Sequence, residues 1–258
     1  MSATQTDTLA ELLELSHELG QPARRYAILG EGNTSARAGD GSFWVKASGS
    51  ELGTLRRDQL VRVGFAACDA MLAGPELTDE ATKDALLAAV VEGEAGVRPS
   101  VETVLHAALL SLPGAEVNFV GHTHPTAVNA LTCSDRFGEA LARRLFPDQV
   151  VVCGESAVLV PYVDPGLPLA REVLARSKAY LDAYGEAPKT VFMQNHGFIA
   201  LGKSANQVLQ ITQMAVKSAE ILAGTFAVGA PSFMTDAQVA RIAGRDDEHY
   251  RQRVLDGV

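Results

Sequence analysis

The chain has 258 residues, 47% of them hydrophobic and 21% charged, a composition that fits a folded globular protein and argues against extended disorder. Its formal net charge is −9 at pH 7, and no stripe of basic residues is present to neutralise phosphates, which argues against a nucleic-acid partner. We find no secretory signal and no apolar run near the ~20 residues that span a bilayer. We therefore expect a cytoplasmic protein without a membrane partner, with Cys68, Cys133 and Cys153 reduced and buried.

The hydrophobic pattern predicts helices and strands that alternate along the chain. A helix is expected at residues 7–19, where leucines recur at helical spacing and Gly20 ends the pattern. A glycine-rich turn at 30–35 is followed by strands at 42–46 and 60–63, helices at 80–91 and 101–110, a strand at 117–120, and a helix that begins beside Pro125 and runs through Leu131. The later part predicts strands near 149–152, 157–160 and 190–193 and helices at 167–182, 205–225 and 236–243. With no internal repeat and no visible domain boundary, this layout favours a single α/β domain.

Three histidines in two short stretches predict a metal site. In an extended strand, side chains two positions apart leave the same face, so His122 and His124 can approach one atom. His196 follows a second predicted strand and precedes Gly197, which lets the backbone turn close to a ligand. Hydrogen-bonded histidine pairs without a metal also occur, but the third histidine favours a divalent ion. Three neutral imidazoles suit zinc, with manganese, cobalt or iron also compatible, and a further position is left for a carboxylate, water or substrate.

Three polar turns could hold an anionic small-molecule substrate. The turn at 30–35 offers backbone N–H groups, the Asn33 amide and the Ser35 hydroxyl, but it lacks the third glycine of a dinucleotide-binding loop. A second turn lies at 48–50, and Ser100 is expected to cap the helix at 101–110, whose N-terminus favours negative charge. Each turn alone fits a plain loop. Together they favour a phosphate or carboxylate cradle.

Glu102 follows Ser100 in the first turn of that predicted helix. It could stabilise the helix dipole, or it could be a metal ligand or general base. His106 shares the same helix face at i+4, so it is either an alternative ligand or a buried residue beside the site.

The motifs together resemble the class II aldolase/adducin family, which includes the fuculose-1-phosphate and rhamnulose-1-phosphate aldolases. The resemblance covers roughly residues 8–225 and rests on Gly32-Asn33-Thr34-Ser35, Ser48-Gly49, Pro99-Ser100-Val101-Glu102, His122-Thr123-His124 and Asn195-His196-Gly197. It implies a single three-layer α/β/α domain over 1–258 with a mixed, mostly antiparallel central sheet. The core would occupy about 8–225, and 226–258 would form a C-terminal helical tail.

The resemblance also implies roles for individual residues. His122, His124 and His196 would bind zinc or another divalent ion, and Glu102 would be the acid/base and contact the metal. The residues expected to bind the substrate phosphate are Gly32, Asn33, Ser48, Gly49 and Ser100. The implied activity is a reversible retro-aldol cleavage of a small ketose phosphate or related hydroxy-ketone, in which the ion stabilises an enediolate. Glu102 would move a proton if the dry site raises its pKa toward neutrality. A homotetramer with sites at subunit interfaces is implied as well.

One departure from the family pattern keeps other reactions open. Val101 stands where sugar-phosphate aldolases commonly carry a second serine, so one phosphate donor is missing. The alternative is a metal-dependent decarboxylase of a hydroxy-acid or dihydroxyaromatic acid, with a sugar-phosphate 4-epimerase or a non-catalytic adducin-like scaffold less favoured. The acid that protonates the leaving aldehyde stays unassigned, because Tyr162, Tyr180 and Tyr250 lie in no motif.

Overall fold

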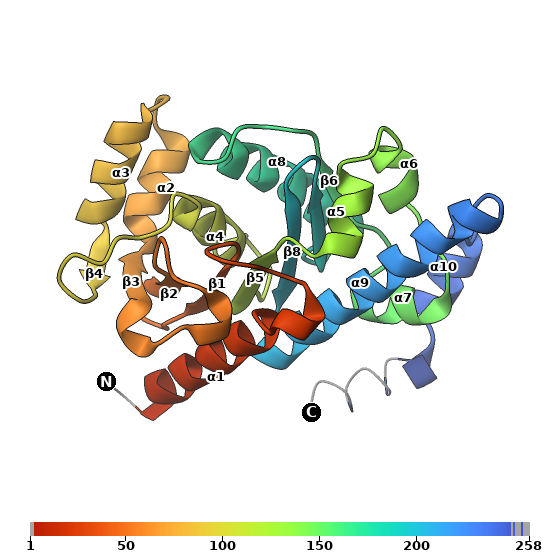
Figure 1. The fold of residues 1–258 in the computed structure, drawn as a ribbon, viewed down its shortest axis with the longest axis horizontal. Coiled ribbons are helices and arrows are strands. Elements are labelled where there is room, and N and C mark those ends of the chain that lie inside the picture. The colour runs from red at the N-terminus through yellow and green to blue at the C-terminus, as the bar shows by residue number, and fades with distance from the viewer. Residues whose placement is uncertain (1–2, 249, 251–253, 255–258) are drawn as a thin grey trace.

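A computed structural model describes residues 3–248, 250 and 254, and its centre is a mixed sheet (Figure 1). In this part of the chain eight strands pair in the order β4-β3-β2-β1-β5-β8-β7-β6. Each pair of neighbours is antiparallel except β6 and β7, which run parallel. The strands are β1 (Asn33–Arg37), β2 (Ser42–Lys46), β3 (Leu60–Gly64), β4 (Val90–Glu92), β5 (Phe119–Thr123), β6 (Val158–Val160), β7 (Thr190–Met193) and β8 (Gly197–Gly202).

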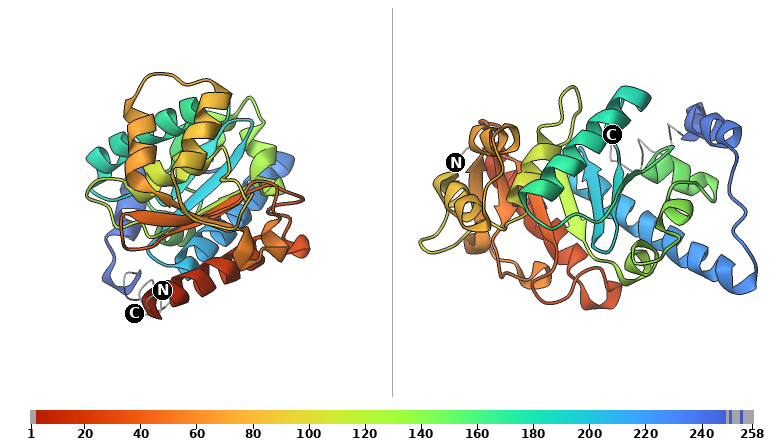
Figure 2. Two further views of the ribbon diagram at one scale, coloured as in Figure 1. Left: turned by 90° about the vertical axis from the view of Figure 1, so that its left-hand side faces the viewer. Right: turned by 90° about the horizontal axis from the view of Figure 1, so that it is seen from above.

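Helices cover both faces of this sheet, as the two views of Figure 2 show. One face packs against α1 (Ala3–Leu19), α5 (Thr126–Thr132) and α9 (Ala205–Val228), and the other against α2 (Phe65–Ala73), α4 (Thr103–Leu110) and α8 (Leu167–Tyr184). The side chains of β2 alternate between two apolar cores: Phe43 and Val45 lie in the core beside α4, and Trp44 lies in the core beside α1. The predicted three-layer α/β/α fold with a mostly antiparallel sheet is confirmed.

The remaining described elements lie at the edges of these layers. They are the helices α3 (Asp79–Ala88), α6 (Phe137–Leu141), α7 (Pro147–Cys153) and α10 (Asp236–Ala243) and the short 3-10 turns Pro22–Arg24, Leu52–Thr54 and Arg57–Gln59. Of the predicted helical tail, α10 lies in the described part, whereas 249, 251–253 and 255–258 lie outside it. No described helix combines the length and the apolar character needed to cross a membrane. The single domain over 1–258 stays a prediction.

The central strands bring distant parts of the sequence together. β5 lies between β1 and β8, and its His122 is opposite Asn33 on one side and Ile199 on the other. β7 and β8 are joined by the short turn that carries His196. The middle of the sheet therefore unites the segments that carry the predicted site.

Several sequence-based expectations are corrected by the structure. The predicted strand at 149–152 is wrong, because Pro147 starts a helix there and the valine run packs that helix against α9. The predicted helix at 80–91 ends at Ala88, and β4 follows. Strand β1 occupies the second half of the expected turn at 30–35. Cys133 is exposed rather than buried, because it follows the last residue of α5 at the surface.

Candidate metal and substrate site

The central strand β5 presents the first histidine of the site. Val120 lies in the core beside α4, and His122, two residues further along, leaves the strand on the same face and is fully buried. Glycine is needed between them, because a Cβ at Gly121 would lie 2.7 Å from the Val208 side chain on the opposite face. His124 follows the end of the strand, and its Nε2 lies 3.1 Å from Nε2 of His122. The two rings thus approach one another, and their binding of one metal ion stays a prediction.

A tight turn between β7 and β8 presents His196. Asn195 adopts a left-handed conformation with φ of 53°, and its N–H donates to the Thr132 carbonyl oxygen. The His196 carbonyl oxygen accepts a hydrogen bond of 3.1 Å from the Asn129 amide. Gly197 is required beside the cluster, since a Cβ there would lie 2.5 Å from the His124 ring. Contacts from α5 and β5 thus fix the turn.

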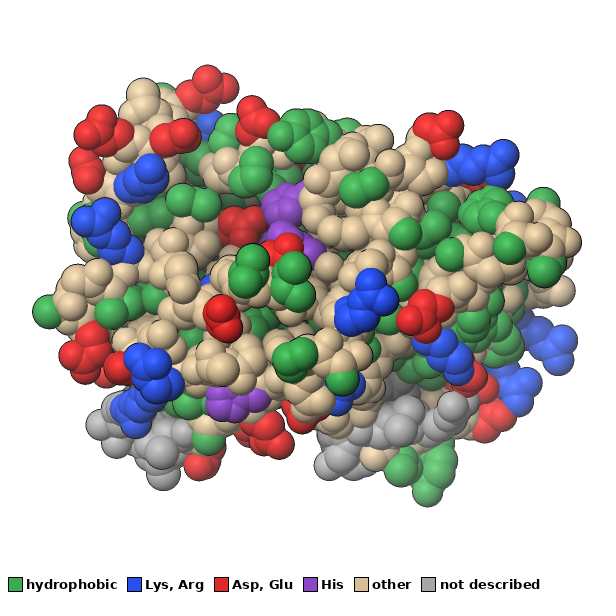
Figure 3. All heavy atoms as spheres, viewed as in Figure 1, with side chains coloured by type: hydrophobic (Ala, Val, Ile, Leu, Met, Phe, Trp, Pro, Cys, Tyr) green, Lys and Arg blue, Asp and Glu red, His purple; other side chains and the backbone are tan. Residues whose placement is uncertain are grey.

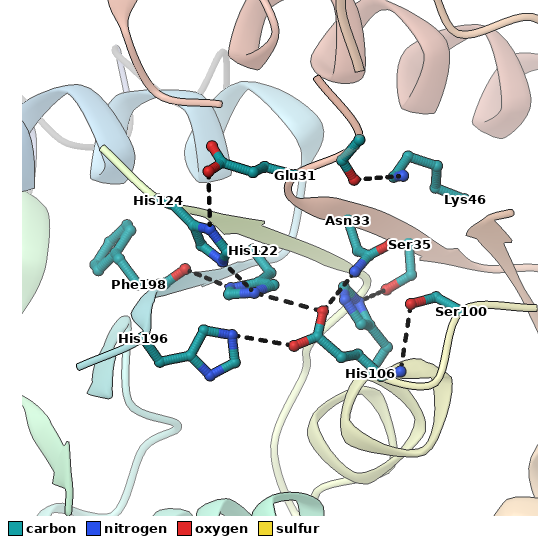
Figure 4. A network of polar contacts seen from close by, with 12 residues as sticks. Glu31, Asn33, Ser35, Lys46, Ser100, His106, His122, His124, His196 and Phe198 are labelled. Carbon is teal, nitrogen blue, oxygen red and sulfur yellow. Dashed lines mark hydrogen bonds and ion pairs between the residues drawn. The ribbon is translucent and has the colours of Figure 1, made fainter. Parts of the chain in front are cut away.

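The donor set fits a divalent metal ion. The ligand nitrogens of His122, His124 and His196 all lie within 4.8 Å of one another. The Nδ1 atom of His122 lies 3.0 Å from the Phe198 carbonyl oxygen, which can only accept a hydrogen bond. Neutral His122 therefore carries its proton on Nδ1 and directs the Nε2 lone pair into the cluster, as metal ligation requires. Figure 4 shows the three rings converging, and Figure 3 shows histidine and acidic side chains side by side in a recess near the middle of one face.

Glu102 completes this cluster with a carboxylate. Its Oε1 lies 3.2 Å from Nε2 of His196 and its Oε2 lies 3.5 Å from Nε2 of His122. The Asn33 amide donates a 2.6 Å hydrogen bond to Oε2. The helix starts two residues later than predicted: Glu102 is the N-cap of α4, and the Ser100 hydroxyl accepts from the Glu102 N–H at 3.3 Å in the turn before it. This turn aims the carboxylate at the histidines.

Burial and neighbouring charges shift the pKa values of the clustered side chains in different directions. Burial raises the pKa of the Glu102 carboxyl, but the charge and hydrogen bonds of His122 and His196 outweigh burial and hold that pKa well below its ordinary value. The expectation that the dry site raises it toward neutrality is therefore wrong. Burial and the two neighbouring histidines lower the pKa of His124 to about 3. Burial also lowers the pKa of His122, yet Glu102 more than compensates and raises it. Protonation of one histidine disfavours protonation of the others, while the buried Glu102 carboxylate needs a positive partner. A single cation bound between them satisfies both conditions.

His106 lies below this cluster and is not one of the three converging histidines. Its Nδ1 is 2.7 Å from the Ser35 hydroxyl of β1. Burial lowers the pKa of His106 to about 3, so the ring is neutral. The Nε2 atom is buried and has no hydrogen-bond partner among the described residues. The sequence allowed two interpretations of His106, an alternative metal ligand or a buried residue beside the site. The structure agrees with the second.

The three polar turns lie next to each other. Ala47 forms an isolated bridge with Pro99, and the Ser48 N–H donates to the Arg98 carbonyl oxygen at 2.9 Å. Ser48 and Gly49 are exposed, whereas Ser100 is 8% exposed. The turn at 48–50 and the segment before α4 are thereby joined.

Lys46 is the first residue that sequence reasoning missed. It is 1% exposed at the end of β2, and its ammonium group donates to the Ser50 carbonyl oxygen at 2.6 Å and to the Gly30 carbonyl oxygen at 3.4 Å. It therefore connects the turn at 30–33 with the turn at 48–50. The available signal was a charged residue that directly follows three apolar residues, 43–45, in the predicted strand.

Glu31 is the second missed residue. Its Oε1 lies 3.8 Å from Nδ1 of His124. An acidic residue between two glycines is an ordinary turn in the sequence, so no pattern indicated this approach.

The sequence assigned no role to Val101 and to three tyrosines, and the structure shows the surroundings of each. The Val101 side chain is 41% exposed next to Glu102. Tyr180 is buried and stacks on Tyr184, with ring centroids 4.4 Å apart. Tyr162 and Tyr250 are exposed, and the Tyr162 hydroxyl donates to Asp164. None of these tyrosines has a described contact with the histidine cluster.

Comparison with known proteins shows the family to which the chain is related. An uncharacterised oxidoreductase of Bacillus subtilis is 29% identical over 81% of this chain, which spans only 29% of that relative's length. A 3-oxo-tetronate 4-phosphate decarboxylase of Haemophilus influenzae is 25% identical over 90% of this chain and 96% of its own. The solved N-terminal class II aldolase domain of a Thermoplasma acidophilum protein has a TM-score of 0.65 and 27% identity, and the match covers 83% of this chain and 93% of that one. Residues 10–223 match the family described as "Class II Aldolase and Adducin N-terminal domain". The chain therefore belongs to the class II aldolase and adducin family.

Proposed function

We propose that the protein is a divalent-metal-dependent lyase that reversibly cleaves a carbon–carbon bond of a small ketose phosphate or related hydroxy-ketone. The observation that carries this proposal is the contact of the Glu102 carboxylate with two of the three converging histidines and with Asn33. A buried, hydrogen-bonded acid that faces the ligand nitrogens can serve both as a metal ligand and as a group that exchanges a proton with a substrate. The chain combines a cation site with a group that can move a proton.

The metal would be held by His122, His124 and His196, with Glu102 as the carboxylate ligand of the resting site. A bound divalent ion supplies Lewis-acid polarisation of a substrate oxygen. Three imidazoles with one carboxylate suit zinc best, while manganese, cobalt and iron are compatible with the same set.

Glu102 would exchange a proton with the substrate carbon next to the bond that breaks. As a carboxylate in the resting site it accepts this proton, and the Asn33 amide at 2.6 Å holds it in place. When the reaction runs in the other direction the same group returns the proton. Removing the Glu102 charge should therefore slow carbon–carbon cleavage more than it weakens substrate binding.

The anionic end of the substrate would lie against the polar turns. Gly32, Asn33, Ser48, Gly49 and Ser100 are the proposed contacts. The buried ammonium group of Lys46 adds positive charge behind the turns at 30–33 and 48–50, which supports an anion there. The substrate class that fits is a small phosphorylated or carboxylated sugar derivative.

A decarboxylase is the second candidate, and two observations favour it. Val101 places an exposed apolar side chain where a second serine donor would be expected. The Haemophilus influenzae relative, which aligns over nearly its whole length, is named for decarboxylation of 3-oxo-tetronate 4-phosphate. The same metal site and Glu102 would serve, because both reactions leave negative charge on the carbon beside a polarised carbonyl. A non-catalytic scaffold is less favoured, since the complete ligand set and Glu102 are present, and a sugar-phosphate 4-epimerase is a further, less favoured alternative.

We further infer a cytoplasmic homotetramer with sites at subunit interfaces. The exposed tyrosines Tyr162 and Tyr250 could then act in a neighbouring subunit's site. The interface could also cover the apolar side chains of Ile28, Leu29 and Val101, which are exposed in the single chain.

Metal analysis followed by a product screen tests the function. The purified protein should contain about one divalent ion per chain, and a chelator should abolish turnover on a panel of ketose phosphates and 3-oxo acid phosphates. Aldehyde release identifies the aldolase, and carbon dioxide release identifies the decarboxylase. The variant His122→Ala should lose both metal and turnover, with the exposed His17→Ala as control. Full lyase turnover in metal-free protein would refute the proposal.

A further inference from the structure

Two carboxylates lie near the cluster, and each approaches different histidines. Glu102 approaches His122 and His196, at 3.5 and 3.2 Å. Glu31 approaches His124, with 3.8 Å between Oε1 and Nδ1. The two nitrogens of the His124 ring thus face different groups, Nδ1 toward Glu31 and Nε2 toward the cluster (Figure 4).

The Glu31 carboxylate is held by its own turn. Its Oε2 accepts a hydrogen bond of 3.0 Å from the Ile28 N–H, and the Glu31 N–H donates to the Ile28 carbonyl oxygen at 3.0 Å. One carboxylate oxygen is therefore occupied, and the other is directed at His124. The side chain is 38% exposed, so a small rotation can close the remaining gap to hydrogen-bond distance.

The backbone of this turn is strained. Leu29 has a φ of 53°, a left-handed conformation that a leucine rarely adopts, and its side chain is 75% exposed. No apolar burial compensates for this conformation at Leu29. Strain of this kind persists where the surrounding structure enforces it, and it concentrates at functional sites.

Close contact with β5 enforces the position of the turn. Gly32 has a φ of 74°, and a Cβ there would lie 2.8 Å from the His122 carbonyl oxygen. The His124 N–H donates to the Tyr26 carbonyl oxygen at 2.8 Å. The segment before β1 therefore contacts the backbone of His122 in β5 and of His124 just after it, and the same segment presents Glu31 to the His124 ring.

We propose that Glu31 is a positioning residue for the metal site. Its carboxylate accepts the Nδ1 proton of His124, which fixes the tautomer with the Nε2 lone pair toward the ion and makes that nitrogen a stronger ligand. The Nδ1–H of His122 donates the equivalent hydrogen bond to the Phe198 carbonyl oxygen. This inference rests on the proposed metal site and adds to it the residue that orients His124.

Metal affinity, measured by chelator competition with Zn²⁺, tests the role without any substrate. Glu31→Ala should weaken binding by about 10- to 100-fold, the usual effect of removing a carboxylate that orients a histidine ligand. Glu31→Gln keeps the shape and an acceptor oxygen but loses the charge, so its loss should be smaller. Glu51→Gln, on an exposed glutamate, is the matched control and should bind Zn²⁺ like the wild type. Urea unfolding of the Zn²⁺-free variants should match that of the wild type, which separates ligand orientation from general damage.

The outcomes separate this inference from the proposed function. If the wild type binds no Zn²⁺, the metal-dependent function itself fails. If the wild type binds Zn²⁺ and both Glu31 variants bind within twofold of it, the metal site stands and the role of Glu31 is refuted. An equal loss in Glu51→Gln would also refute it, because the effect would then be one of net charge.

Discussion

Burial of the Lys46 ammonium group should make the stability of the protein depend on alkaline pH. The side chain is 1% exposed, and its ammonium group donates to the carbonyl oxygens of Ser50, Gly30 and Ala47. Burial lowers the pKa of Lys46 from 10.5 to about 8, although the Glu102 charge acts in the opposite direction. The perturbation is Lys46→Met, which keeps a similar length and removes the charge.

The sign and size follow from proton linkage. Below pH 8 both the folded and unfolded states carry the Lys46 proton, and folding bears the full cost of burying the charge. Between pH 8 and 10.5 the folded state loses this proton first, so the free energy of unfolding rises by about 1.4 kcal/mol per pH unit. Over the whole range between the two pKa values the free energy of unfolding rises by about 3 kcal/mol, and about 2 kcal/mol of this rise falls between pH 7.5 and pH 10.

Urea unfolding at pH 7.5 and pH 10 measures this effect as a double difference. The wild type should gain about 2 kcal/mol over Lys46→Met on going to pH 10, because groups common to both proteins cancel. Lys83→Met, at an exposed position of α3, should show no such difference from the wild type. If Lys46→Met and the wild type have the same pH dependence, Lys46 does not titrate as a buried group and the account of its environment is wrong.

Three further predictions concern the site itself. Glu102→Gln should retain bound metal but lower kcat by about 10²- to 10⁴-fold on any substrate that the wild type cleaves; turnover close to that of the wild type would remove Glu102 from the chemistry. Gly197→Ala should cost about 1–3 kcal/mol of stability in urea unfolding and weaken metal binding, because the added Cβ would lie 2.5 Å from the His124 ring. Gly138→Ala, which meets nothing within 4 Å in a helix, should be neutral or stabilising, and an equal loss in the two variants would contradict the steric argument. Val101→Ser should lower KM for phosphorylated substrates relative to unphosphorylated ones, and an unchanged ratio would dissociate this position from phosphate binding.

Much of the fold could be predicted because its main elements have clear periodicity. Leucines at helical spacing predicted α1, and the alternation at 42–46 predicted β2. The strand at 149–152 was wrong because three consecutive valines favour a strand locally, whereas Pro147 and packing on α9 select a helix. β1 was missed because Asn33, Thr34 and Ser35 are polar residues typical of turns. They become strand through pairing with β5, which begins more than 80 residues later in the chain.

The histidine cluster could be predicted because period-two spacing on a strand is a local geometric fact. The contacts around it depend on tertiary structure. Lys46 is buried because β2 lies inside the sheet, between β1 and β3, and its ammonium group finds backbone oxygens rather than a motif partner. Glu31 reaches His124 only because its turn is pressed against β5. Such contacts leave no periodic pattern in a single sequence.

Asn33 would connect the proposed proton-transfer group, Glu102, to the proposed anion cradle. Its amide donates to Glu102 at 2.6 Å, and it lies opposite His122 in the β1–β5 pairing. The Asn33 amide nitrogen has two protons, and the amide oxygen is buried with no hydrogen-bond partner in the described part of the chain. One N–H of the Asn33 amide can therefore keep donating to Glu102 while the other donates to a substrate oxygen. Because the position of one side chain sets both contacts, an anion that binds the turn also fixes the carboxylate that would act on its carbon chain.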